Sequence, residues 1–413
     1  MASFYRQILP MISSFLFFVV FFVSYANAEL RIRNFMTGDE IAESDNIKAL
    51  LSKMNKPAVK TIQSPDGDIV DCVLIHQQPA FDHPLLKGHN LLDPPKSLKR
   101  NMLSMTGKQD RHFQIWTKSN ESCPEGSIPI RRTTEQDLLR ASSIERFGRK
   151  LGRNSKATAS DDHQHSIARV NGTFRGAKAF FNVWAPKVES TEEFSLAQMW
   201  ISAGSFETDD LNTVEAGWQV YPMQYGDDRP RLFVYWTRDA YQNTGCYNLI
   251  CSGFVQFSTK VLVGGSFAAA STYNGDQLEI NLHVWKDADA WWLELGGETV
   301  GYWPAEIFTL LWTSPNTTVD FGGEIFTIRD PSSGHTTTEM GSGHFASEGF
   351  KKAALIRNMQ IVDENGALTT PPTPVVIMDE SNCYTIQVTP EGEYANWGAF
   401  LFHGGPGKNS ACP

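Results

Sequence analysis

The sequence predicts an all-β protein: an antiparallel β-sandwich domain (161–413) preceded by a small mixed α+β domain (29–160). After His163, segments rich in β-branched and aromatic residues follow one another, which favours strands. Gly, Asp, Asn and Pro separate these segments at intervals of about ten residues, the spacing of a sandwich or barrel. We find no helical period of useful length and no internal repeat in this part of the sequence.

Residues 1–28 have the pattern of a signal peptide. Arg6 precedes a short apolar run, and Ala26-Asn27-Ala28 fits the small-residue rule for cleavage after Ala28. Pro10 interrupts the run, which is short for a membrane span; a retained anchor is the alternative. No later stretch of the sequence is long and apolar enough to cross a bilayer. We therefore expect a secreted protein with no membrane partner.

The region 29–160 mixes helical and strand patterns. Alternation from Val59 to Leu74 around Ser64-Pro65-Asp66-Gly67 predicts a hairpin. A first helix is expected to end at Lys56-Pro57 and to carry the apolar residues Ile47, Leu50, Leu51 and Met54. A second helix is expected to open at Thr133-Thr134 with a capping box completed by Gln136 and Asp137. This second helix would present Leu138, Leu139, Ile144 and Phe147.

The composition changes between Arg140 and Lys156, where Arg, Lys, Gly and Ser dominate. Such a stretch is exposed and easily cut. Composition leaves two interpretations open. The stretch is either a plain linker between domains or a maturation site that separates an inhibitory propeptide from the domain after it.

The strands of the second domain are expected in segments separated by turn residues: Ala177–Val188, Ser195–Ser205, Thr213–Tyr225, Leu232–Thr237, Phe254–Val263, Leu278–Trp285, Trp291–Leu295, Thr317–Ile328, Ala353–Val362, Cys383–Val388 and Trp397–His403.

Charge and cysteine content restrict the partners and the compartment. A net charge of −10 and a pI near 5.5 argue against a nucleic-acid partner. Six cysteines in an exported chain predict three disulfides, for which fifteen pairings are possible. Grouping by domain suggests Cys72–Cys123, Cys246–Cys251 and Cys383–Cys412. Sequons predict glycosylation on surface loops at Asn120, Asn171 and Asn316.

Several classes of site are excluded by motif. The sequence has no G-x-S-x-G elbow, no H-E-x-x-H, no phosphate loop and no G-x-G-x-x-G after a strand. Its cysteines are accounted for by disulfides, which argues against a thiol nucleophile. His163 and His165 form an H-x-H pair in the linker, where a solvated role is favoured over metal binding. We expect no metal and no cofactor.

Two strand segments carry candidate acids. In a strand, alternate side chains face opposite ways. Val214, Ala216, Trp218 and Val220 therefore form an apolar core face, and Glu215, Gly217, Gln219 and Tyr221 form the other. In the second segment, Gly322, Glu324 and Phe326 share one face. An ordinary solvent-exposed face is the alternative for both segments, and Glu294 and Glu298 compete for any carboxylate role.

Two facing carboxylates can perform acid–base catalysis. Proximity and burial separate their pKa values, so that one is ionised as the base and the other is protonated as the acid. The base takes a proton from water, while the acid polarises an amide carbonyl and protonates the leaving nitrogen. Such a pair works best at low pH.

The sequence resembles the neprosin family of plant secreted proteins over nearly the whole mature chain. The matching motifs are Val214–Pro222, Gly245–Asn248, Val300–Pro304, Phe321–Ile325, Thr338–Phe345 and Phe402–Asn409. Lys60–Val73 and Gln78–Leu86 resemble the activation peptide of that family.

This resemblance implies a glutamic endopeptidase that cleaves after proline, is made as a zymogen and matures in acid. It assigns the catalytic acids to Glu215 and Glu324 and the substrates to proline-containing peptides or proteins. It also favours propeptide cleavage between about Gly148 and Asp162, and secretion to the extracellular space, apoplast or cell wall. Candidates for lining the substrate site, with core packing as the alternative, are Trp218, Gln219, Tyr221 and Tyr302.

Two other functions remain open from the sequence. A glycoside hydrolase could use the same carboxylate pair on a sandwich. A non-catalytic module that binds carbohydrate or cell wall could use the aromatic residues as platforms. A propeptide argues against both, because a binding module has little reason to carry one.

Overall fold

The computed structural model describes residues 38–94, 113–141, 143, 147–150, 163–328, 334–389, 394 and 396–413. The chain divides into two compact units, Met1–Lys53 and Met54–Pro413. Helix α2 (Gly38–Met54) forms the described part of the first unit and contains the first predicted helix. The predicted signal peptide lies outside the described residues. Among those that are described, no helix is long and apolar enough to span a membrane.

The second unit begins with a small antiparallel sheet in the order β1 (Ala58–Gln63), β2 (Ile69–Leu74) and β3 (Ser127–Arg131). Strands β1 and β2 form the predicted hairpin. Helix α3 (Glu135–Arg140) opens with the predicted capping box, in which Thr134 and Asp137 exchange side-chain and backbone hydrogen bonds. The helix ends at Arg140, so Phe147 is not part of it, and Ile144 lies outside the described residues.

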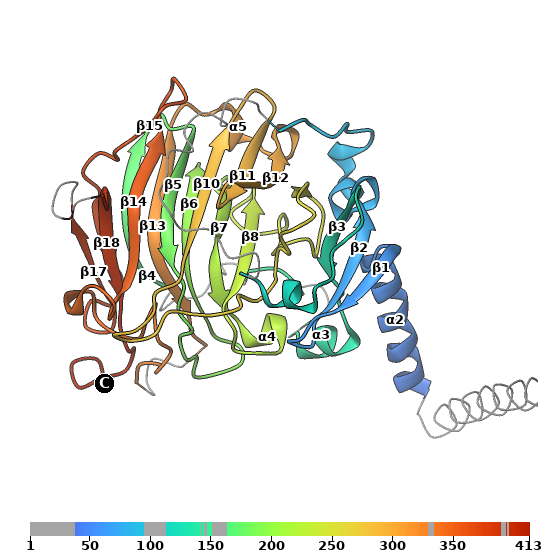
Figure 1. Ribbon diagram of the computed structural model, residues 1–413, viewed down its shortest axis with the longest axis horizontal. Helices are drawn as coiled ribbons and strands as arrows, with labels where there is room; N and C mark the ends of the chain where they lie inside the picture. Colours follow the sequence, from blue (N-terminus) through green and yellow to red (C-terminus); the bar gives the residue numbers. More distant parts are fainter. Residues whose placement is uncertain are drawn as a thin grey trace, which may run out of the picture. The chain divides into compact units, whose positions relative to one another are not determined.

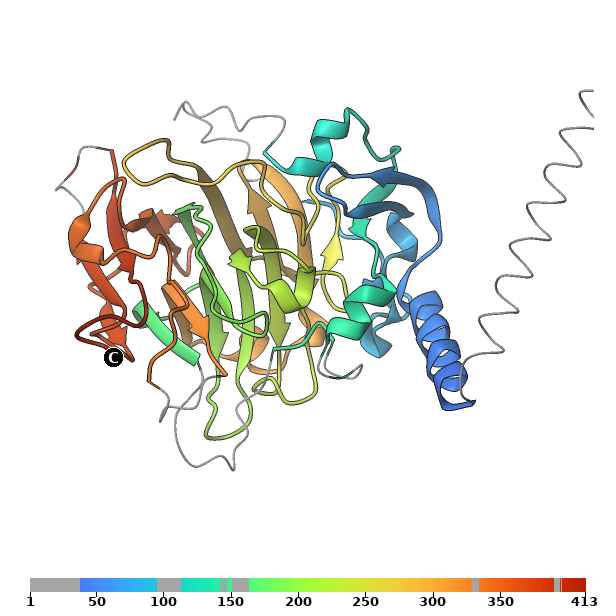
Figure 2. The same cartoon turned by 90° about the horizontal axis from the view of Figure 1, so that it is seen from below.

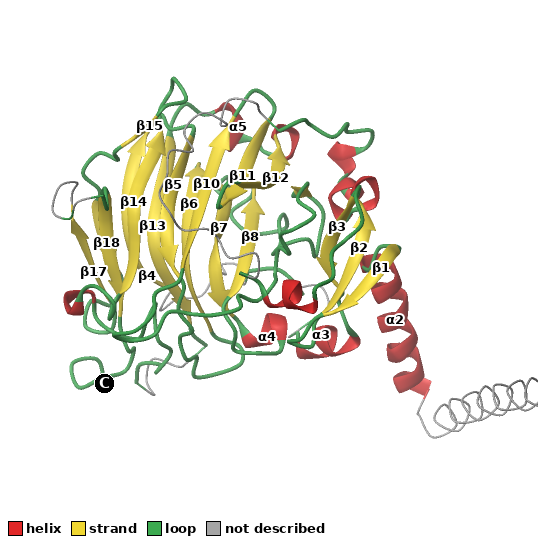
Figure 3. Ribbon diagram, in the orientation of Figure 1, coloured by secondary structure: helices red, strands yellow, loops and turns green. Residues whose placement is uncertain are grey.

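Two larger antiparallel sheets form the predicted β-sandwich (Figures 1 and 3). The nine-stranded sheet has the order β17 (Thr385–Thr389), β18 (Ala399–Gly404), β14 (Ala354–Val362), β5 (Gly176–Asn182), β10 (Glu279–Lys286), β11 (Ala290–Leu295), β12 (Glu298–Pro304) and β9 (Val255–Gln256), with β15 (Leu368–Thr369) paired to β14. The six-stranded sheet has the order β16 (Val375–Met378), β4 (His163–Gly172), β13 (Thr317–Phe326), β6 (Phe194–Ala203), β7 (Asn212–Val220) and β8 (Arg231–Thr237).

The hydrophobic core lies between these two sheets. The alternate apolar residues of β7 (Val214, Ala216, Trp218 and Val220) are buried in it, as their period of two predicts. The indole nitrogen of Trp218 donates a hydrogen bond to the carbonyl of Asn182 at the end of β5, 3.0 Å away, and so joins the two layers. Each sheet therefore has one face in the core and one face directed away from it, and Glu215 lies on the outer face of β7.

Three expected strands are shorter than the sequence pattern suggests. The segment expected over Ala177–Val188 is a strand only to Asn182, the end of β5. Strand β7 ends at Val220, because Pro222 begins a helical turn, α4 (Pro222–Tyr225). The segment expected to run from Phe254 to Val263 pairs only at β9. There the amides of Phe257 and Ser258 both donate to the carbonyl of Val300, which interrupts a regular ladder.

Short helices (Figure 2) and three disulfides complete the fold. The remaining helices are α5 (Leu310–Thr313), η1 (Ile75–Gln77), η2 (Pro79–Asp82), η3 (Pro84–Leu86), η5 (Ile115–Ser119), η7 (Ala305–Ile307) and η9 (Ala346–Glu348). The disulfides are Cys72–Cys123, Cys246–Cys251 and Cys383–Cys412, the pairings that grouping by domain suggests. The side chains of Asn120, Asn171 and Asn316 are exposed, as glycosylation requires.

Candidate active site

The two candidate acids lie on one face of the six-stranded sheet, opposite the core. Glu215 is on β7 and Glu324 is on β13, with β6 between these strands. Gln198 on β6 pairs with Gly217 on one side and with Gly322 on the other. The two glycines leave the space on either side of the Gln198 side chain free of other side chains. Glu324 and Glu215 therefore approach each other across a floor formed by Gln198.

A methyl group at Gly217 would disrupt this floor. An added Cβ would lie 2.2 Å from the carbonyl oxygen of Ala197 and 2.5 Å from Cβ of Gln198, closer than any real contact. We therefore expect Gly217→Ala to lower the free energy of unfolding by about 1–3 kcal/mol or more. Urea unfolding of the proenzyme, followed by tryptophan fluorescence, measures this change. An unchanged unfolding midpoint would contradict the close approach of β6 and β7.

Glu215 is fully buried and held by hydroxyl groups. Its Oε1 accepts hydrogen bonds from Thr213 Oγ1 at 2.8 Å and from the Tyr241 hydroxyl at 2.6 Å. Burial, and then the negative charge of Glu215, raise the pKa of Tyr241 well above its ordinary value, so this phenol remains a donor. The exposed-face alternative for Glu215 is therefore wrong.

Glu324 is also buried, and its neighbours differ from those of Glu215. His163 Nδ1 lies 2.5 Å from Glu324 Oε1, and Gln198 Nε2 donates to Oε2 at 3.4 Å. Burial alone would raise the pKa of Glu324. The positive charges of Lys150, His163 and His165 outweigh burial and hold that pKa well below its usual range. The exposed-face alternative is wrong for Glu324 as well.

A lysine from the N-terminal region joins the two acids. Lys150 Nζ lies 2.7 Å from Glu215 Oε2 and 3.5 Å from Glu324 Oε2. Burial lowers the pKa of Lys150, but the two carboxylates outweigh it, and the net pKa is raised. The rings of Tyr235 and Tyr241 lie 5.6 and 5.5 Å from the same ammonium. Both acids therefore share one buried cation.

The backbone around Lys150 is held against the sandwich. The Tyr247 amide donates to the carbonyl of Gly148 at 2.7 Å, and the Lys150 amide donates to the Tyr235 hydroxyl at 3.2 Å. Tyr247 belongs to the loop closed by the Cys246–Cys251 disulfide. The segment 147–150 is thus fixed in place, with its last side chain directed at the acids.

A cavity of about 570 Å³ is lined by Glu324 and Lys150, and its volume lies in the range of small-ligand sites. Its wall includes the aromatic side chains of Trp200, Phe206 and Tyr241. Phe206 and Tyr241 stack, with ring centroids 5.9 Å apart. The cavity also contains polar and charged side chains, including Lys150, His163, His165, Arg169, Asp320, Glu324 and Asp379.

The four predicted substrate-lining residues do not line this cavity. Trp218 is in the core on the opposite face of β7, so core packing is the correct interpretation. Gln219 and Tyr221 follow Glu215 on the same face, but both are buried. Gln219 Nε2 donates a hydrogen bond to the hydroxyl of Tyr225, and Tyr221 packs in an aromatic cluster. The hydroxyl of Tyr302 instead accepts a hydrogen bond from the amide of Leu92 in the N-terminal region.

The sequence does not identify three positions of this site. His163 and His165 lie in β4 and line the cavity beside Glu324, so their predicted place in the linker is wrong, although both side chains are partly exposed. Their alternation with the core residues of β4 was the available signal. The sequence places Lys150 in a basic stretch, and no pattern distinguishes it from the neighbouring basic residues.

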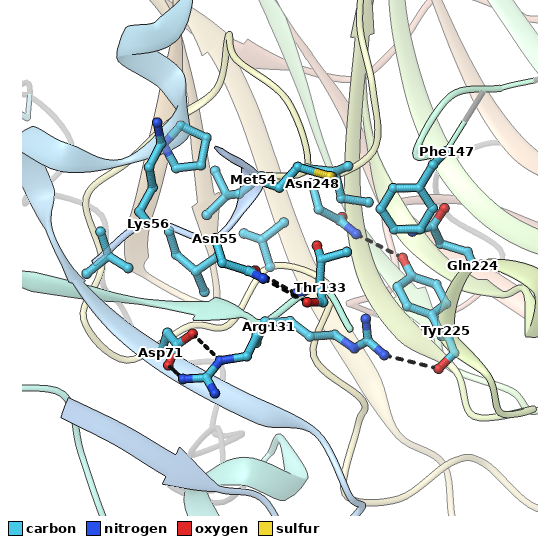
Figure 4. A pocket seen from close by; sticks show the side chains of 18 residues that line it. Met54, Asn55, Lys56, Asp71, Arg131, Thr133, Phe147, Gln224, Tyr225 and Asn248 are labelled. Atoms are coloured by element: carbon cyan, nitrogen blue, oxygen red, sulfur yellow. Dashed lines mark hydrogen bonds and ion pairs between the residues drawn. The ribbon is translucent and has the colours of Figure 1, made fainter. Parts of the chain in front are cut away.

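A second pocket lies where the small sheet meets the sandwich (Figure 4). Arg131 donates to the carbonyl of Tyr225 at 3.2 Å, and Asn248 Nδ2 donates to the hydroxyl of Tyr225 at 3.0 Å. Phe147 lines the same pocket. Phe147, three residues before Lys150, therefore lies in the same pocket as residues of the small sheet and of the sandwich.

Family models match both parts of the chain. A model described as Neprosin matches residues 191–406, and one described as Neprosin activation peptide matches residues 61–169. The activation-peptide match begins within β1, includes Lys150 and continues through His163 and His165 into β4, and the neprosin match includes both acids. They support a peptidase with an activation peptide.

Solved structures with weak similarity include two peptidases and a lectin. Scytalido-glutamic peptidase with a transition state analog inhibitor is 12% identical, with 59% of this chain and 98% of that chain covered at a TM-score of 0.32. SCP-B, a member of the Eqolisin family of peptidases, in complex with a tripeptide, is 9% identical (60% and 100% covered, TM-score 0.28). CG-16, a homodimeric agglutinin from chicken liver, is 9% identical (39% and 98% covered, TM-score 0.20).

Proposed function

This chain belongs to the neprosin family, and from that premise we propose that it is a secreted glutamic endopeptidase that acts in acid, cleaves after proline and is made as a zymogen. The observation that carries the proposal is the shared contact of Glu215 and Glu324 with Lys150. Two buried carboxylates that converge on one point can activate a water molecule there. A cation from the region matched by the activation-peptide model keeps them from doing so.

The proposed reaction is peptide hydrolysis without a covalent intermediate. One carboxylate accepts a proton from water, and the water oxygen forms a bond to the substrate carbonyl carbon. The other acid donates its proton to the amide nitrogen as the C–N bond breaks. The products are a carboxylic acid and an amine. Exchange with solvent then removes the proton that the base took from water and returns one to the donating acid.

The aromatic wall of the cavity supports a preference for proline. Trp200, Phe206 and Tyr241 offer flat apolar surfaces in the cavity that Glu324 lines, and Tyr241 also contacts Glu215. A pyrrolidine ring can pack against such surfaces without losing conformational entropy. These residues replace the substrate-lining set expected from the sequence.

The domain boundaries belong to the same proposal: a signal peptide at 1–28, an activation propeptide at 29–160 and a catalytic domain at 161–413. Strand β4, from His163, is paired along its whole length with β13, which supports a boundary just before it. We expect the maturing cut after Lys150, within 151–162, because removal of the propeptide must withdraw the ammonium. Three disulfides support an oxidising, extracellular location.

The proposed specificity is tested with two quenched peptides that differ by a single Pro→Ala change. After acid treatment of the secreted protein, we expect cleavage after proline, fastest in acid, and at least about tenfold slower cleavage of the alanine peptide. Mass spectrometry of the products identifies the bond that is cut. Processed protein that releases sugars from a polysaccharide and leaves both peptides intact would contradict the proposal in favour of a glycoside hydrolase.

A further inference from the structure

His163 is the first residue of β4 and makes a direct contact with Glu324. Residue 163 pairs with Phe326 in the β-ladder, and residue 165 pairs with Glu324, so both histidines lie on the face that carries the acids. His163 Nδ1 is 2.5 Å from Glu324 Oε1, and its side chain is 13% exposed. Its ring lies 4.9 Å from that of Phe326 and 5.7 Å from that of Phe194. These rings fix the imidazole in position.

The two acids differ in the groups that remain beside them after maturation. Lys150 contacts both, but it belongs to the segment before the proposed cut. Glu324 keeps His163, whereas Glu215 keeps two neutral hydroxyl groups on Oε1. Withdrawal of Lys150 frees Glu215 Oε2, which then has room to carry a proton. A cation beside one carboxylate and neutral donors beside the other are what an acid–base pair requires.

We propose that His163 is a positioning residue that keeps Glu324 ionised in acid, so that Glu324 is the general base and Glu215 the general acid. This inference rests on the proposed peptidase function and deepens it. A histidine side chain carries a proton under acidic conditions. Its positive charge then opposes protonation of the carboxylate that it contacts. At the same time its N–H holds Oε1 of Glu324, which directs Oε2 toward the point that Lys150 Nζ occupies in the proenzyme.

Other charged groups around Glu324 have weaker or compensated effects. His165 Nε2 is 3.9 Å from Glu324 Oε1, and its other ring nitrogen already pairs with Asp379 at 2.8 Å. Arg169 is paired with Asp320 at 2.7 Å. Glu207 lines the exposed side of the cavity. Among the described residues of the sandwich, His163 is thus the basic side chain that contacts Glu324 at the shortest distance.

The test compares His163→Asn with the matched control His165→Asn in the acid-matured enzyme. The asparagine amide can occupy the position of Nδ1 and donate the same hydrogen bond, but it carries no charge. The pH dependence of kcat/KM on the proline peptide is measured for both variants. We expect His163→Asn to move the acid limb up by about one pH unit or more. That shift lowers kcat/KM about tenfold or more at pH values below the wild-type acid limb. His165→Asn should move the acid limb by less than half as much as His163→Asn does.

Each other outcome has a distinct meaning. If His163→Asn moves the alkaline limb upward instead, Glu324 is the acid and the assignment of roles is overturned. An unchanged profile in a variant whose thermal unfolding matches that of wild type would overturn the role of His163. Amino-terminal sequencing of the mature enzyme must find residue 163 retained, and its loss would also overturn the inference. Failure of the wild-type enzyme to cleave any peptide would instead reject the proposed function.

Discussion

Glutamine in place of Glu324 is expected to lower kcat of the matured enzyme on the proline peptide by about 10³-fold, and Glu215→Gln to lower it by a similar factor. A carboxamide keeps the shape of the side chain but can neither accept a proton from water nor deliver one to the leaving nitrogen. Because each acid has its own role, neither can replace the other. Steady-state kinetics on the matured variants measures both losses.

Glu294 provides the matched control for these substitutions. It lies on β11 of the nine-stranded sheet, and burial raises its pKa, so it is a perturbed glutamate outside the proposed site. Glu294→Gln should leave kcat unchanged. If Glu294→Gln abolishes cleavage while Glu215→Gln does not, the pair of acids has been assigned to the wrong face of the molecule.

Substitution of Lys150 by methionine is expected to make the uncut proenzyme at least about tenfold more active near pH 5 than the wild-type proenzyme. Methionine fills similar space but leaves the two buried carboxylates without their cation. The loss of this ion pair destabilises the docked state by about 3–5 kcal/mol. The segment should therefore vacate the site more often. Activity is measured on the proline peptide before any processing is visible on a gel.

The neighbouring residue supplies the control for Lys150. Arg149 donates to the carbonyl of Asn243 and does not belong to the cavity beside the acids. The Arg149→Met proenzyme should therefore be as inactive before processing as the wild-type proenzyme. A Lys150→Met proenzyme that remains equally latent, with the same pH dependence of maturation, would show that the ammonium does not control access to the acids.

The direction of the pH dependence follows from the pKa shifts in the proenzyme. The pKa of Glu324 is lowered in the proenzyme by Lys150 and by the histidines that stay with the sandwich, so pairing with Lys150 stabilises the docked segment above the pKa that Glu324 has once Lys150 is withdrawn. This stabilisation is lost as the pH falls toward the lower pKa of the docked state. The pKa of Lys150 is raised, so its charge persists until the pH rises above 10.5. Acid therefore weakens the contact through the carboxylates. Maturation followed on gels should accelerate as the pH is lowered through the acidic range.

The period of the strands explains what the sequence could predict. Alternation separates Glu215 from Trp218 and places Glu324 on one face with Gly322, and the structure confirms both faces. Alternation cannot say whether the outer face meets solvent. Glu215 is buried because Lys150, 65 residues earlier in the chain, covers it together with a cluster of tyrosine rings.

Pairing between distant segments explains what the sequence could not predict. The sequence pattern places His163 in the linker because the first strand that it predicts begins at Ala177, whereas β4 begins at His163. It belongs to the site because β4 pairs with β13, more than 150 residues later. Tyr302 is an aromatic candidate from the sequence, but it lies on β12 in the nine-stranded sheet. There the hydroxyl of Tyr302 accepts a hydrogen bond from the amide of Leu92.

The claim that two carboxylates act on water is tested most directly by hydrolysis in oxygen-18 water. After many turnovers of the proline peptide, mass spectrometry measures the label in the product and in digests of the enzyme that contain Glu215 or Glu324. We predict oxygen-18 in the new carboxyl group of the product and none in either glutamate. Label in one of the glutamates would reveal a covalent intermediate and contradict the proposed mechanism.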